Sequence, residues 1–279
     1  FEPTIAGTRL NYGGQFYDLQ IFGSHNLQNL MGAMYLAREL NISEAELLTS
    51  RIGKEIIKLE GDWAELIRCT PSLGRVMALT RNDSCVHEKH GEYDNISIGP
   101  GHGLVLNHDI DLRLFMSHWH FGFAVSETVA SGRRHSFQFF DINGEAVHKI
   151  YIPKGDNLRA YKAIVSKFRS ANQTEEISIH KLPSGKKDIS DGNVDIENFI
   201  SHWTNLKDTH HFFGMLNEFG VGRRQSMRLA EGRFTRQLDN NCLHGALDRA
   251  VADGTSIMCF VGNPGCIQIH TGKINKIVI

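Results

Sequence analysis

The chain has 279 residues, of which 41% are hydrophobic and 22% are charged. This composition is that of a folded globular protein and excludes wholesale disorder. The 30 Lys and Arg residues against 31 Asp and Glu residues leave a net charge of −1, which argues against a nucleic-acid-binding protein or a polybasic membrane protein. The sequence contains no apolar run of the length that spans a bilayer, so we expect a protein that is not embedded in a membrane.

The numbers of cysteines and histidines narrow the class of protein further. The five cysteines form no Cys-x-x-Cys pair, which argues against a disulfide framework or a structural zinc site and favours a reducing cytoplasm. The N-terminus lacks the basic and apolar profile of a signal peptide. Histidine is the outlier, with 15 residues, and raises the question of a metal or a cofactor.

The first 70 residues contain turn and helix-start signals. A hairpin turn is expected at 12–16 between two short strands, followed by a helix over 26–40. Ser43 and Glu46 have the spacing of a capping box at a helix start. Asp62 is placed to cap a short helix over 63–69 that ends near Pro71.

The apolar pattern changes to a period of two from residue 75 to residue 152. It predicts seven antiparallel strands, arranged as a meander, at 75–80, 84–89, 94–98, 102–107, 112–126, 134–141 and 146–152. Asn143-Gly144 is a strong hairpin turn. An amphipathic helix over 157–169 follows, and the polar stretch 172–194 indicates an interdomain linker with one short strand.

The last third of the chain predicts helices and then a copy of the first strands. Helices are expected at 195–205, 207–219, 223–231 and 239–253, with strands at 256–262, 265–270 and 273–279. The stretch 256–279 aligns without gaps to 75–98 at an offset of 181 residues, with six matches in 24 positions. Together with the preceding helices, this similarity predicts an internal duplication whose second copy is incomplete.

The segment Trp203–Leu216 is the densest cluster of ligand-type residues. His210 and His211 precede two phenyl rings, Phe212 and Phe213, on an expected helix that Asp208 or Thr209 could cap. Imidazole is a good ligand for haem iron, and aromatic neighbours suit a flat macrocycle. The alternative is that Phe212 belongs to the core and the histidines are exposed residues at the helix start.

A second cluster lies on the expected strand over 112–126. Strand alternation places Arg113 on one face with Phe115, Ser117, Trp119, Phe121 and Phe123. An arginine among aromatic rings needs an anion or a ligand. Alternatively, because Arg113 stands at the start of the strand, its long side chain could place the guanidinium in solvent. His118 and His120 on the other face could bind a metal, but no third ligand stands at a spacing that is typical of metal sites.

Two further arginines follow the histidine segment. Arg223 and Arg224 stand at a helix start after Gly220-Val221-Gly222 and could hold carboxylates through paired hydrogen bonds. A phosphate-binding loop, a nucleophile elbow and a zinc-protease motif are all absent from the sequence.

From about residue 41 onward, the chain resembles the haemin-degrading and haem-transport proteins of bacterial haem uptake, the HmuS/HemS type. The resemblance rests on the following phrases: Arg81-Asn82 with Val86-His87-Glu88, Asp111-Leu112-Arg113-Leu114-Phe115, Gln138-Phe139-Phe140-Asp141, Asp208-Thr209-His210 with Phe212-Phe213, and Phe260-Val261-Gly262-Asn263-Pro264-Gly265-Cys266. The family is a duplicated fold, in agreement with the repeat.

The resemblance implies an α+β fold with two similar halves, each an antiparallel sheet with packed helices. It also implies a segment of other origin at 1–40, a first repeat at 41–171, a linker at 172–194 and an incomplete second repeat at 195–279. The first 40 residues do not look like the family. Their 23–29 segment instead resembles Mur-type ligases, although without the phosphate loop that ligase activity needs.

For the site, the resemblance implies that His210 is the proximal haem ligand, with His211 as an alternate ligand and Phe212 beside it. Arg113 is implied on the other side of the haem, as the catalytic residue of any degradation, and Arg223 near a propionate. The implied function is a cytoplasmic haem-binding protein of iron acquisition that serves haem transport, oxidative degradation with O₂ and an electron donor, or both.

The sequence leaves rival functions open. A purely non-enzymatic haem carrier and a His-rich transition-metal protein are the alternatives to a haem-degrading enzyme. The partners that the resemblance suggests are haem, an inner-membrane haem importer, a haem oxygenase and a second copy in a homodimer.

Overall fold

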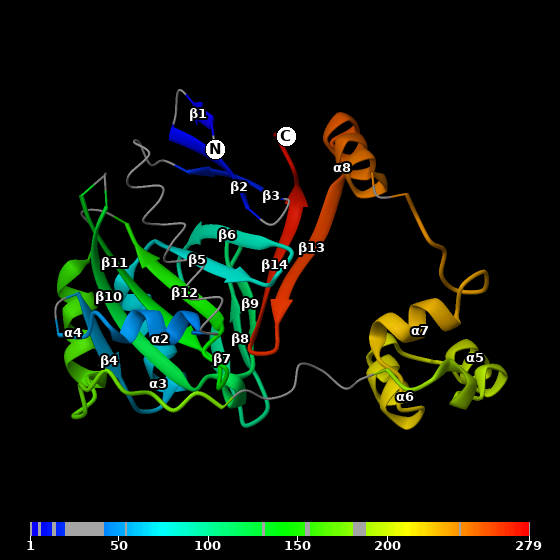
Figure 1. Ribbon diagram of the computed structural model, residues 1–279, viewed down its shortest axis with the longest axis horizontal. Coiled ribbons are helices and arrows are strands. Elements are labelled where there is room, and N and C mark those ends of the chain that lie inside the picture. Colours follow the sequence, from blue (N-terminus) through cyan, green and yellow to red (C-terminus); the bar gives the residue numbers. More distant parts are fainter. Residues whose placement is uncertain are drawn as a thin grey trace. The chain divides into compact units, whose positions relative to one another are not determined.

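The computed structural model describes residues 2–4, 7–12, 15–19, 42–53, 55–129, 132–153, 157–180, 188–239 and 241–278. The chain divides into two compact units, which are considered separately below. The first comprises residues 1–180 and 259–270, and the second comprises residues 181–258 and 271–279. Figure 1 shows the sheets of the first unit and the short helices of the second. The chain is an α+β protein with antiparallel sheets, as predicted.

Three strands form a small antiparallel sheet near the N-terminus, β1 (Glu2–Thr4), β2 (Gly7–Tyr12) and β3 (Gln15–Leu19). Tyr12 pairs with Gln15, so the hairpin predicted at 12–16 is confirmed. The helix predicted at 26–40 and the ligase-like segment at 23–29 lie outside the described residues.

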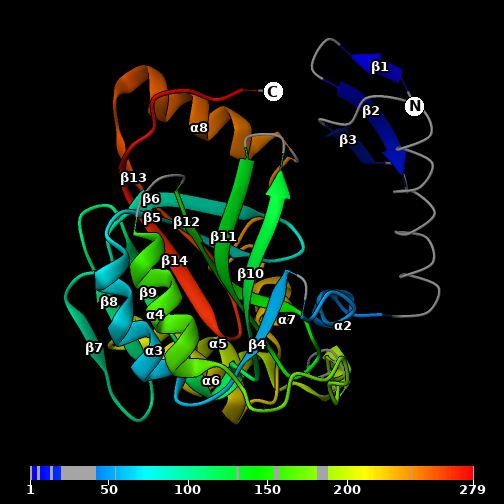
Figure 2. The same cartoon turned by 90° about the vertical axis from the view of Figure 1, so that its left-hand side faces the viewer.

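The helix starts in the first unit follow their capping signals. Helix α2 (Glu44–Thr49) begins with the predicted capping box, in which the backbone N–H of Ser43 donates to the Glu46 carboxylate at 2.7 Å. Helix α3 (Trp63–Cys69) is capped by Asp62, which accepts from the backbone N–H of Ala64 at 2.8 Å. A 3₁₀ turn, η1 (Thr70–Leu73), follows at Pro71. Helix α4 (Leu158–Phe168) confirms the predicted amphipathic helix and lies beside α3 (Figure 2).

The strands from β4 onward form two sheets and not the predicted single meander. The first sheet has the order β4-β10-β11-β12-β5-β6, and its bounds are β4 (Ile56–Leu59), β10 (Phe121–Val129), β11 (Gly132–Phe140), β12 (Ala146–Ile152), β5 (Val76–Arg81) and β6 (Val86–Gly91). The second has the order β13-β14-β9-β8-β7, and its bounds are β13 (Ser256–Asn263), β14 (Cys266–Lys273), β9 (Asp111–Leu114), β8 (Gly103–Leu106) and β7 (Ile96–Ile98). The chain therefore changes sheet after β6 and again after β9.

The single strand predicted over 112–126 is wrong. Strand β9 ends at Leu114, and a 3₁₀ turn, η2 (Met116–His118), separates it from β10. The backbone N–H of Phe115 donates to the carbonyl of Gly265 at 3.0 Å, and the Trp119 indole donates to the same carbonyl at 2.8 Å. Contacts from a distant part of the chain thus hold the turn in place, and period-two alternation stops at its start.

The main core lies between the two sheets and under α3 and α4. It includes Val76 and Phe139 of the first sheet, Leu112 and Leu114 of the second, and Phe168 of α4. The hairpin turn at Asn143-Gly144 is also confirmed, because Gly144 has a φ of +78° and joins β11 to β12. A Cβ at Gly144 would lie 2.2 Å from the Ser43 hydroxyl, so the turn and the α2 cap fit together only with glycine.

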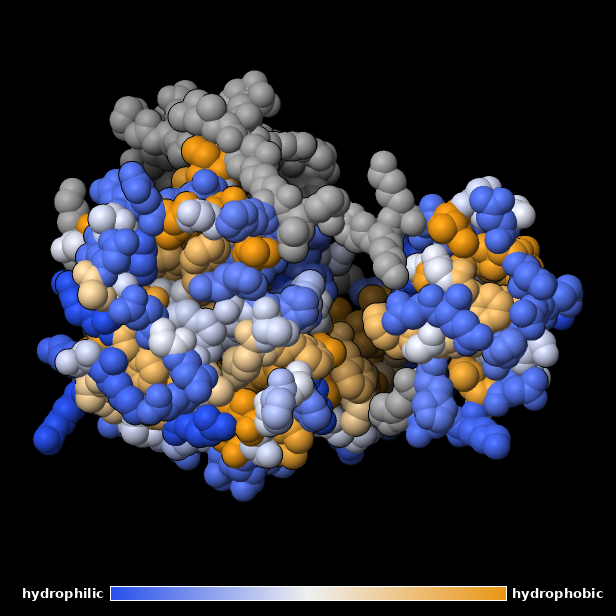
Figure 3. All heavy atoms as spheres, turned by 90° about the horizontal axis from the view of Figure 1, so that it is seen from below, coloured by the Kyte–Doolittle hydropathy of each residue, from blue (hydrophilic) through white to orange (hydrophobic). Residues whose placement is uncertain are grey.

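The second unit consists mainly of short helices around a small core of its own. They are η3 (Asp191–Asn193), α5 (Ile196–Thr204), η4 (Thr209–His211), α6 (Phe212–Glu218), α7 (Arg223–Leu229) and α8 (Cys242–Asp253). Phe199, Met215 and Leu216 are buried among them. Apolar side chains interrupt the polar surface of the part that carries α5, α6 and α7 (Figure 3), and Phe213 is the most exposed of the large ones there, at 71%.

Two strand predictions near the C-terminus and in the linker fail. Strand β14 continues to Lys273, and the described residues 274–278 form no third strand. The described parts of the linker, 172–180 and 188–194, contain no strand either. The longest of the described helices, α8, has 12 residues, and none of the helices in those residues could cross a membrane.

Candidate functional site

Arg113 projects from the face of the second sheet that points away from the core. Its neighbours Leu112 and Leu114 are fully buried, so alternation places Arg113 on the opposite face, where its side chain is 33% exposed. The guanidinium forms an ion pair with Asp111, two residues earlier on the same face, and Nη1 also donates to the carbonyl of Leu112 at 3.3 Å. The strand therefore contains the anion that Arg113 was expected to need.

Sequence reasoning missed Asp111 as the partner of Arg113. The signal was present, since residues two apart in a strand share a face and an Asp-x-Arg pair is complementary in charge. With this carboxylate beside it, Arg113 is not a free cation. It keeps further N–H donors that the Asp111 and Leu112 contacts do not use.

Apolar side chains surround this ion pair on the same face of the sheet. Leu104 of β8 and Ile267 of β14 lie opposite Arg113 in the strand register, and Ile269 lies opposite Asp111. Ile269 is buried, with 5% of its surface exposed, so the accessible part of this surface, which we call the outer face, comprises Leu104, Leu106, Asp111, Arg113 and Ile267. An apolar surface around one guanidinium suits a flat apolar ligand that carries a polar group.

The aromatic face predicted beside Arg113 is not present. Because η2 interrupts the strand, Trp119 turns into the core and packs against Phe139, with ring centroids 4.6 Å apart. Phe123 is buried in a separate cluster with Phe140. The aliphatic residues of β8 and β14 are thus the neighbours of Arg113, and they come from strands that sequence alternation alone does not bring together.

The histidine segment lies in the second unit, at the junction of η4 and α6. His210 and His211 are in the 3₁₀ turn, and Phe212 begins the helix, so the single helix predicted over 207–219 is two elements. His211 occupies the N-cap position without a side-chain cap bond, and its backbone N–H donates to the carbonyl of Asp208 at 3.0 Å. The helical segment as a whole begins one turn earlier, in η4 directly after Asp208, so the prediction that Asp208 or Thr209 caps it stays a prediction.

The side chains of the histidine segment divide between core and surface. Phe212 is half-buried and packs against Trp203, with ring centroids 4.7 Å apart. His211 and Phe213 are exposed. The alternative that Phe212 belongs to the core thus holds in part, while an exposed phenyl ring remains next to an exposed imidazole.

Arg223 begins helix α7 and is exposed, with no ion pair to any described residue. Arg228, one turn later, differs because it pairs with Asp191 at 2.8 Å and lies 3.7 Å from Asp188. Arg224, next to Arg223, is also exposed and forms no ion pair with a described residue, so these two arginines of α7, and not Arg228, could pair with an external carboxylate.

A buried polar cluster in the first unit is separate from these residues. The His148 ring bonds to the Tyr93 hydroxyl at 2.5 Å and the Thr80 hydroxyl at 2.8 Å, and the Thr80 hydroxyl lies 3.3 Å from the Cys266 sulfur. Burial lowers the pKa of His148 to about 3 and raises the pKa of Cys266 to about 12. A neutral imidazole and a protonated thiol, both out of reach of solvent, indicate a structural role.

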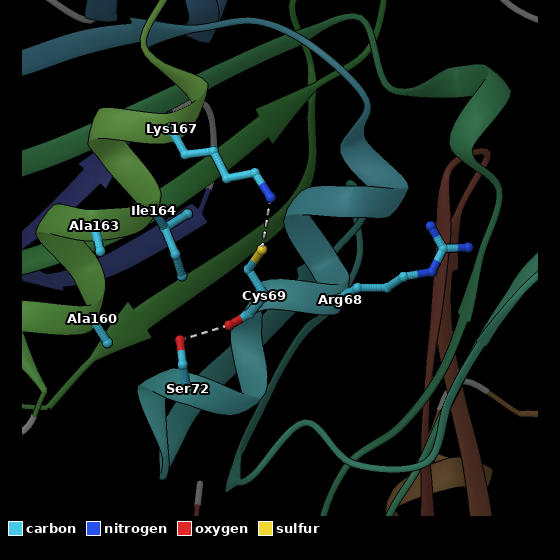
Figure 4. Close-up of a pocket in the computed structure, with 7 residues that line it drawn as sticks. All are labelled: Arg68, Cys69, Ser72, Ala160, Ala163, Ile164 and Lys167. Carbon is cyan, nitrogen blue, oxygen red and sulfur yellow. Dashed lines mark hydrogen bonds between the residues drawn. The ribbon is translucent and has the colours of Figure 1, made fainter.

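A shallow groove of about 340 Å³ lies between α3 with η1 and α4 (Figure 4), lined by Arg68, Cys69, Ser72, Ala160, Ala163, Ile164 and Lys167. Lys167 points toward Cys69 and is bound to Glu65 at 2.7 Å. None of the residues predicted for the site lines this groove. Within the described residues no cluster of three or more metal-ligating side chains occurs, and His118 and His120 are both exposed.

Comparison with known proteins now places the chain in a family. The model of the haemin-degrading HemS/ChuX domain matches residues 41–168 and 220–279. The chain belongs to the HemS/ChuX family. The two matched segments include Arg113 and Arg223, whereas His210, His211 and Phe212 fall in the stretch between them.

Similar proteins in this family carry haem-related names. The hemin transport protein HmuS of Yersinia pestis is 38% identical over 247 residues, which cover 87% of this chain and 70% of HmuS. The structure of holo-PhuS, a heme-binding protein from Pseudomonas aeruginosa, matches with a TM-score of 0.82 and 38% identity over 90% of this chain and 75% of PhuS. The heme-degrading enzyme ChuS of Escherichia coli O157:H7 matches with a TM-score of 0.80 and 30% identity over 91% of this chain and 75% of ChuS.

Proposed function

We propose that this protein is a cytoplasmic haem-binding protein of bacterial haem uptake, which accepts imported haem for trafficking, oxidative degradation with release of iron, or both. The observation that carries the proposal is the 38% identity to a hemin transport protein over 87% of the chain, together with the fold shared with holo-PhuS. The outer face supports it, because haem presents a large apolar ring with a polar metal centre.

Each residue of the proposed site has one task. His210 is the imidazole ligand of the iron, with His211 as the alternate ligand and Phe212 as a neighbour of the ring. Arg113 donates a hydrogen bond on the other side of the haem, and Arg223 pairs with a propionate. Its part of this assignment is supported by the exposure of the Arg223 guanidinium, which forms no ion pair within the described part of the chain.

The proposed organisation has a first repeat at 41–171, a linker at 172–194 and a second repeat at 195–279, after a segment at 1–40 that is foreign to the family. The match of the family model to residues 41–168 and 220–279 supports two repeats. A haem importer, a haem oxygenase and a second copy of the chain are the partners that this function would use.

A haem titration followed by absorbance tests the function directly. We expect a saturable Soret shift that His210→Ala moves in wavelength and weakens in affinity, with a smaller effect of His211→Ala. If His210→Ala keeps the wild-type spectrum, the double variant decides whether His211 has replaced it. A wild-type spectrum in the double variant would remove both histidines from the site.

Two charge variants test whether Arg113 faces the bound haem. Arg113→Ala should raise the pKa of water on ferric haem, because loss of a positive charge disfavours hydroxide, and Asp111→Asn should lower it. An unchanged pKa in Arg113→Ala would show that Arg113 does not face the haem.

Arg223→Glu tests the contact with a propionate. The substitution should weaken binding of haem much more than binding of its propionate dimethyl ester, because only haem carries the carboxylates. Equal losses for the two ligands would show that Arg223 acts through folding.

A carrier without enzymatic activity is the second candidate function, since similar proteins are named both as a heme-binding protein and as a heme-degrading enzyme. The haem complex should be given O₂ and a reductant in the presence of catalase, which removes the free peroxide that bleaches haem without an enzyme. Loss of the Soret band would identify an enzyme, with Arg113→Ala slowing the loss, and a stable band would identify a carrier.

A further inference from the structure

A chain of hydrogen bonds connects the β10–β11 hairpin to helix α4. Ser126 of β10 and His135 of β11 lie opposite each other in the strand register, and the Ser126 hydroxyl is 2.8 Å from Nδ1 of His135. The same hydroxyl is 3.3 Å from the hydroxyl of Tyr161 on α4, which donates to the carbonyl of Val125 at 3.1 Å. Burial raises the pKa of Tyr161 to about 12, so this phenol keeps its proton.

The direction of the chain follows from the protons that its members have to donate. The carbonyl of Val125 can only accept, so it takes the one proton of Tyr161, and the phenol oxygen must then accept from Ser126. Because this uses the only proton of Ser126, Nδ1 of His135 must donate to the serine oxygen. The other ring nitrogen, Nε2, has no hydrogen-bond partner among the residues that the structure describes. It has a lone pair in the neutral imidazole and becomes a donor on protonation.

The charges that act on this imidazole are positive. Arg133 precedes His135 by two residues on β11 and shares its face of the sheet, and Lys162 follows Tyr161 on α4. Both are exposed, and neither forms an ion pair with a described residue. Burial, followed by the charges of Arg133 and Lys162, holds the pKa of His135 below its ordinary value.

The adjacent arginine has a different environment. Arg134 lies on the other face of β11 and donates twice to the carboxylate of Glu127, at 2.6 and 3.0 Å. The hairpin therefore provides a carboxylate for one arginine, whereas Arg133 and Lys162 are gathered beside His135 without one in the described part of the chain.

We propose that Arg133, His135 and Lys162 form a binding site for a small dianion of the phosphate class, and that His135 holds it in the protonated form. Two cations and an imidazolium repel one another, and a dianion between them removes this repulsion and accepts a charge-assisted hydrogen bond from each. Because Nδ1 already carries a proton, the proton taken up on binding goes to Nε2, the nitrogen that contacts the ligand. The site uses none of the residues proposed for haem.

NMR titration of His135 in the full-length protein tests the site. Sulfate is the first probe, because it remains a dianion between about pH 5 and 8, where histidine titrates. The C2 proton resonance of His135, identified by its absence in His135→Gln, is followed in sulfate and in sodium chloride of equal ionic strength. We expect saturable sulfate binding that raises the pKa of His135 by about one relative to chloride, so that affinity increases roughly ten-fold as the pH falls through that pKa.

The titration is repeated with inorganic phosphate and with glycerol phosphate. Saturable binding of either supports the proposal, and the tighter of the two shows whether the ligand is free phosphate or a phosphate ester. The same pKa of His135 in sulfate and in chloride would overturn the proposal, and this comparison of the wild-type protein does not depend on whether a variant folds.

A matched set of variants separates a built site from general surface charge. Arg133→Gln and Lys162→Gln should each weaken sulfate binding several-fold. Arg134→Gln removes the same charge as Arg133→Gln, but from the other face of β11, and should leave sulfate affinity unchanged. Equal losses in Arg133→Gln and Arg134→Gln would show that sulfate responds only to the net charge of the hairpin, which would also overturn the proposal.

Discussion

The hairpins β5–β6 and β13–β14 have the same turn but different surroundings. In the first, the side-chain oxygen of Asn82 accepts from the backbone N–H groups of Ser84 and Cys85, both at 2.9 Å. In the second, the side-chain oxygen of Asn263 accepts from Gly265 at 3.0 Å and Cys266 at 2.9 Å. The Asn-x-x-Cys phrase therefore builds the same local structure twice.

The burial of the cysteine nevertheless differs between the two turns. Cys85 is exposed, whereas Cys266 is fully buried against Thr80 and beside His148. Strand β5 lies between β12 and β6, while its counterpart β13 is the last strand of its sheet, with Phe260 58% exposed. Local sequence thus determines the turn, and tertiary neighbours determine what the turn is used for.

The largest expected difference between the hairpins is thiol reactivity. Burial raises the pKa of Cys266 to about 12, and no reagent can reach its sulfur in the folded state. Its modification then requires unfolding, so we expect Cys85 to react at least about a thousand-fold faster in native buffer. Mass spectrometry of a time course with a maleimide measures both rates, and rapid labelling of Cys266 would contradict the packing described above.

A second expected effect concerns the stability of the protein in acid, because buried Cys266 lies beside His148 whereas Cys85 is exposed. Tyr93, Thr80 and Cys266 enclose a His148 whose pKa burial lowers to about 3, against about 6.5 in the unfolded chain. Since the unfolded state binds the proton first, stability should decrease as the pH falls from about 6.5 to 3, by at most roughly 4–5 kcal/mol from this group. Urea unfolding across this pH range measures the slope.

The control for this effect is His148→Gln, which keeps a polar side chain but does not titrate. Its stability should be lower at pH 7 and should depend less on pH between 6.5 and 3. An unchanged slope in the variant would mean that another group produces the acid sensitivity.

How far the sequence predicts this fold depends on the range of the contacts involved. The α2 capping box, the Asp62 cap and the Asn143-Gly144 turn were predictable, because each depends on residues within four positions of one another. The break between β9 and β10 was not, because it depends on the carbonyl of Gly265, which is 150 residues from Phe115. The distribution of strands between two sheets depends on packing of the same long-range kind.

The same distinction between short-range and long-range contacts decides how much of the candidate site could be predicted from the sequence. The ion pair of Asp111 with Arg113 follows from strand alternation and could have been found. The approach of Ile267 to Arg113 could not, since β14 joins β9 only through the tertiary fold. The alignment of 256–279 with 75–98 did identify the hairpin that supplies Ile267, although its third strand does not form in the described residues.

The asparagines of the two turns give a smaller, stability-based comparison. Asn263 is half-buried and donates to the carbonyls of Arg81 and Val147, at 2.9 and 2.8 Å, in addition to its turn bonds. Asn82 is exposed and donates only to Gly262. Removing hydrogen bonds from partly buried carbonyls is the costlier change, so we expect Asn263→Ala to lose about 2–3 kcal/mol and Asn82→Ala about 1 kcal/mol or less. Chemical unfolding measures both, and equal losses would show that the contacts of the two asparagines are energetically equivalent.

The smallest effect is expected where the second hairpin meets the proposed haem site. Ile267 lies opposite Arg113 on the outer face, and its counterpart Val86 is on the open edge strand β6. If haem covers the outer face, Ile267→Ala removes apolar contact area of the order of 1 kcal/mol, which corresponds to a roughly five-fold loss of haem affinity. Val86→Ala removes a similar side chain at the equivalent position and should leave affinity unchanged. Absorbance titrations of the two variants measure this difference. Equal affinities with intact haem binding would place the ligand away from Ile267, whereas equal losses would indicate a general effect on folding.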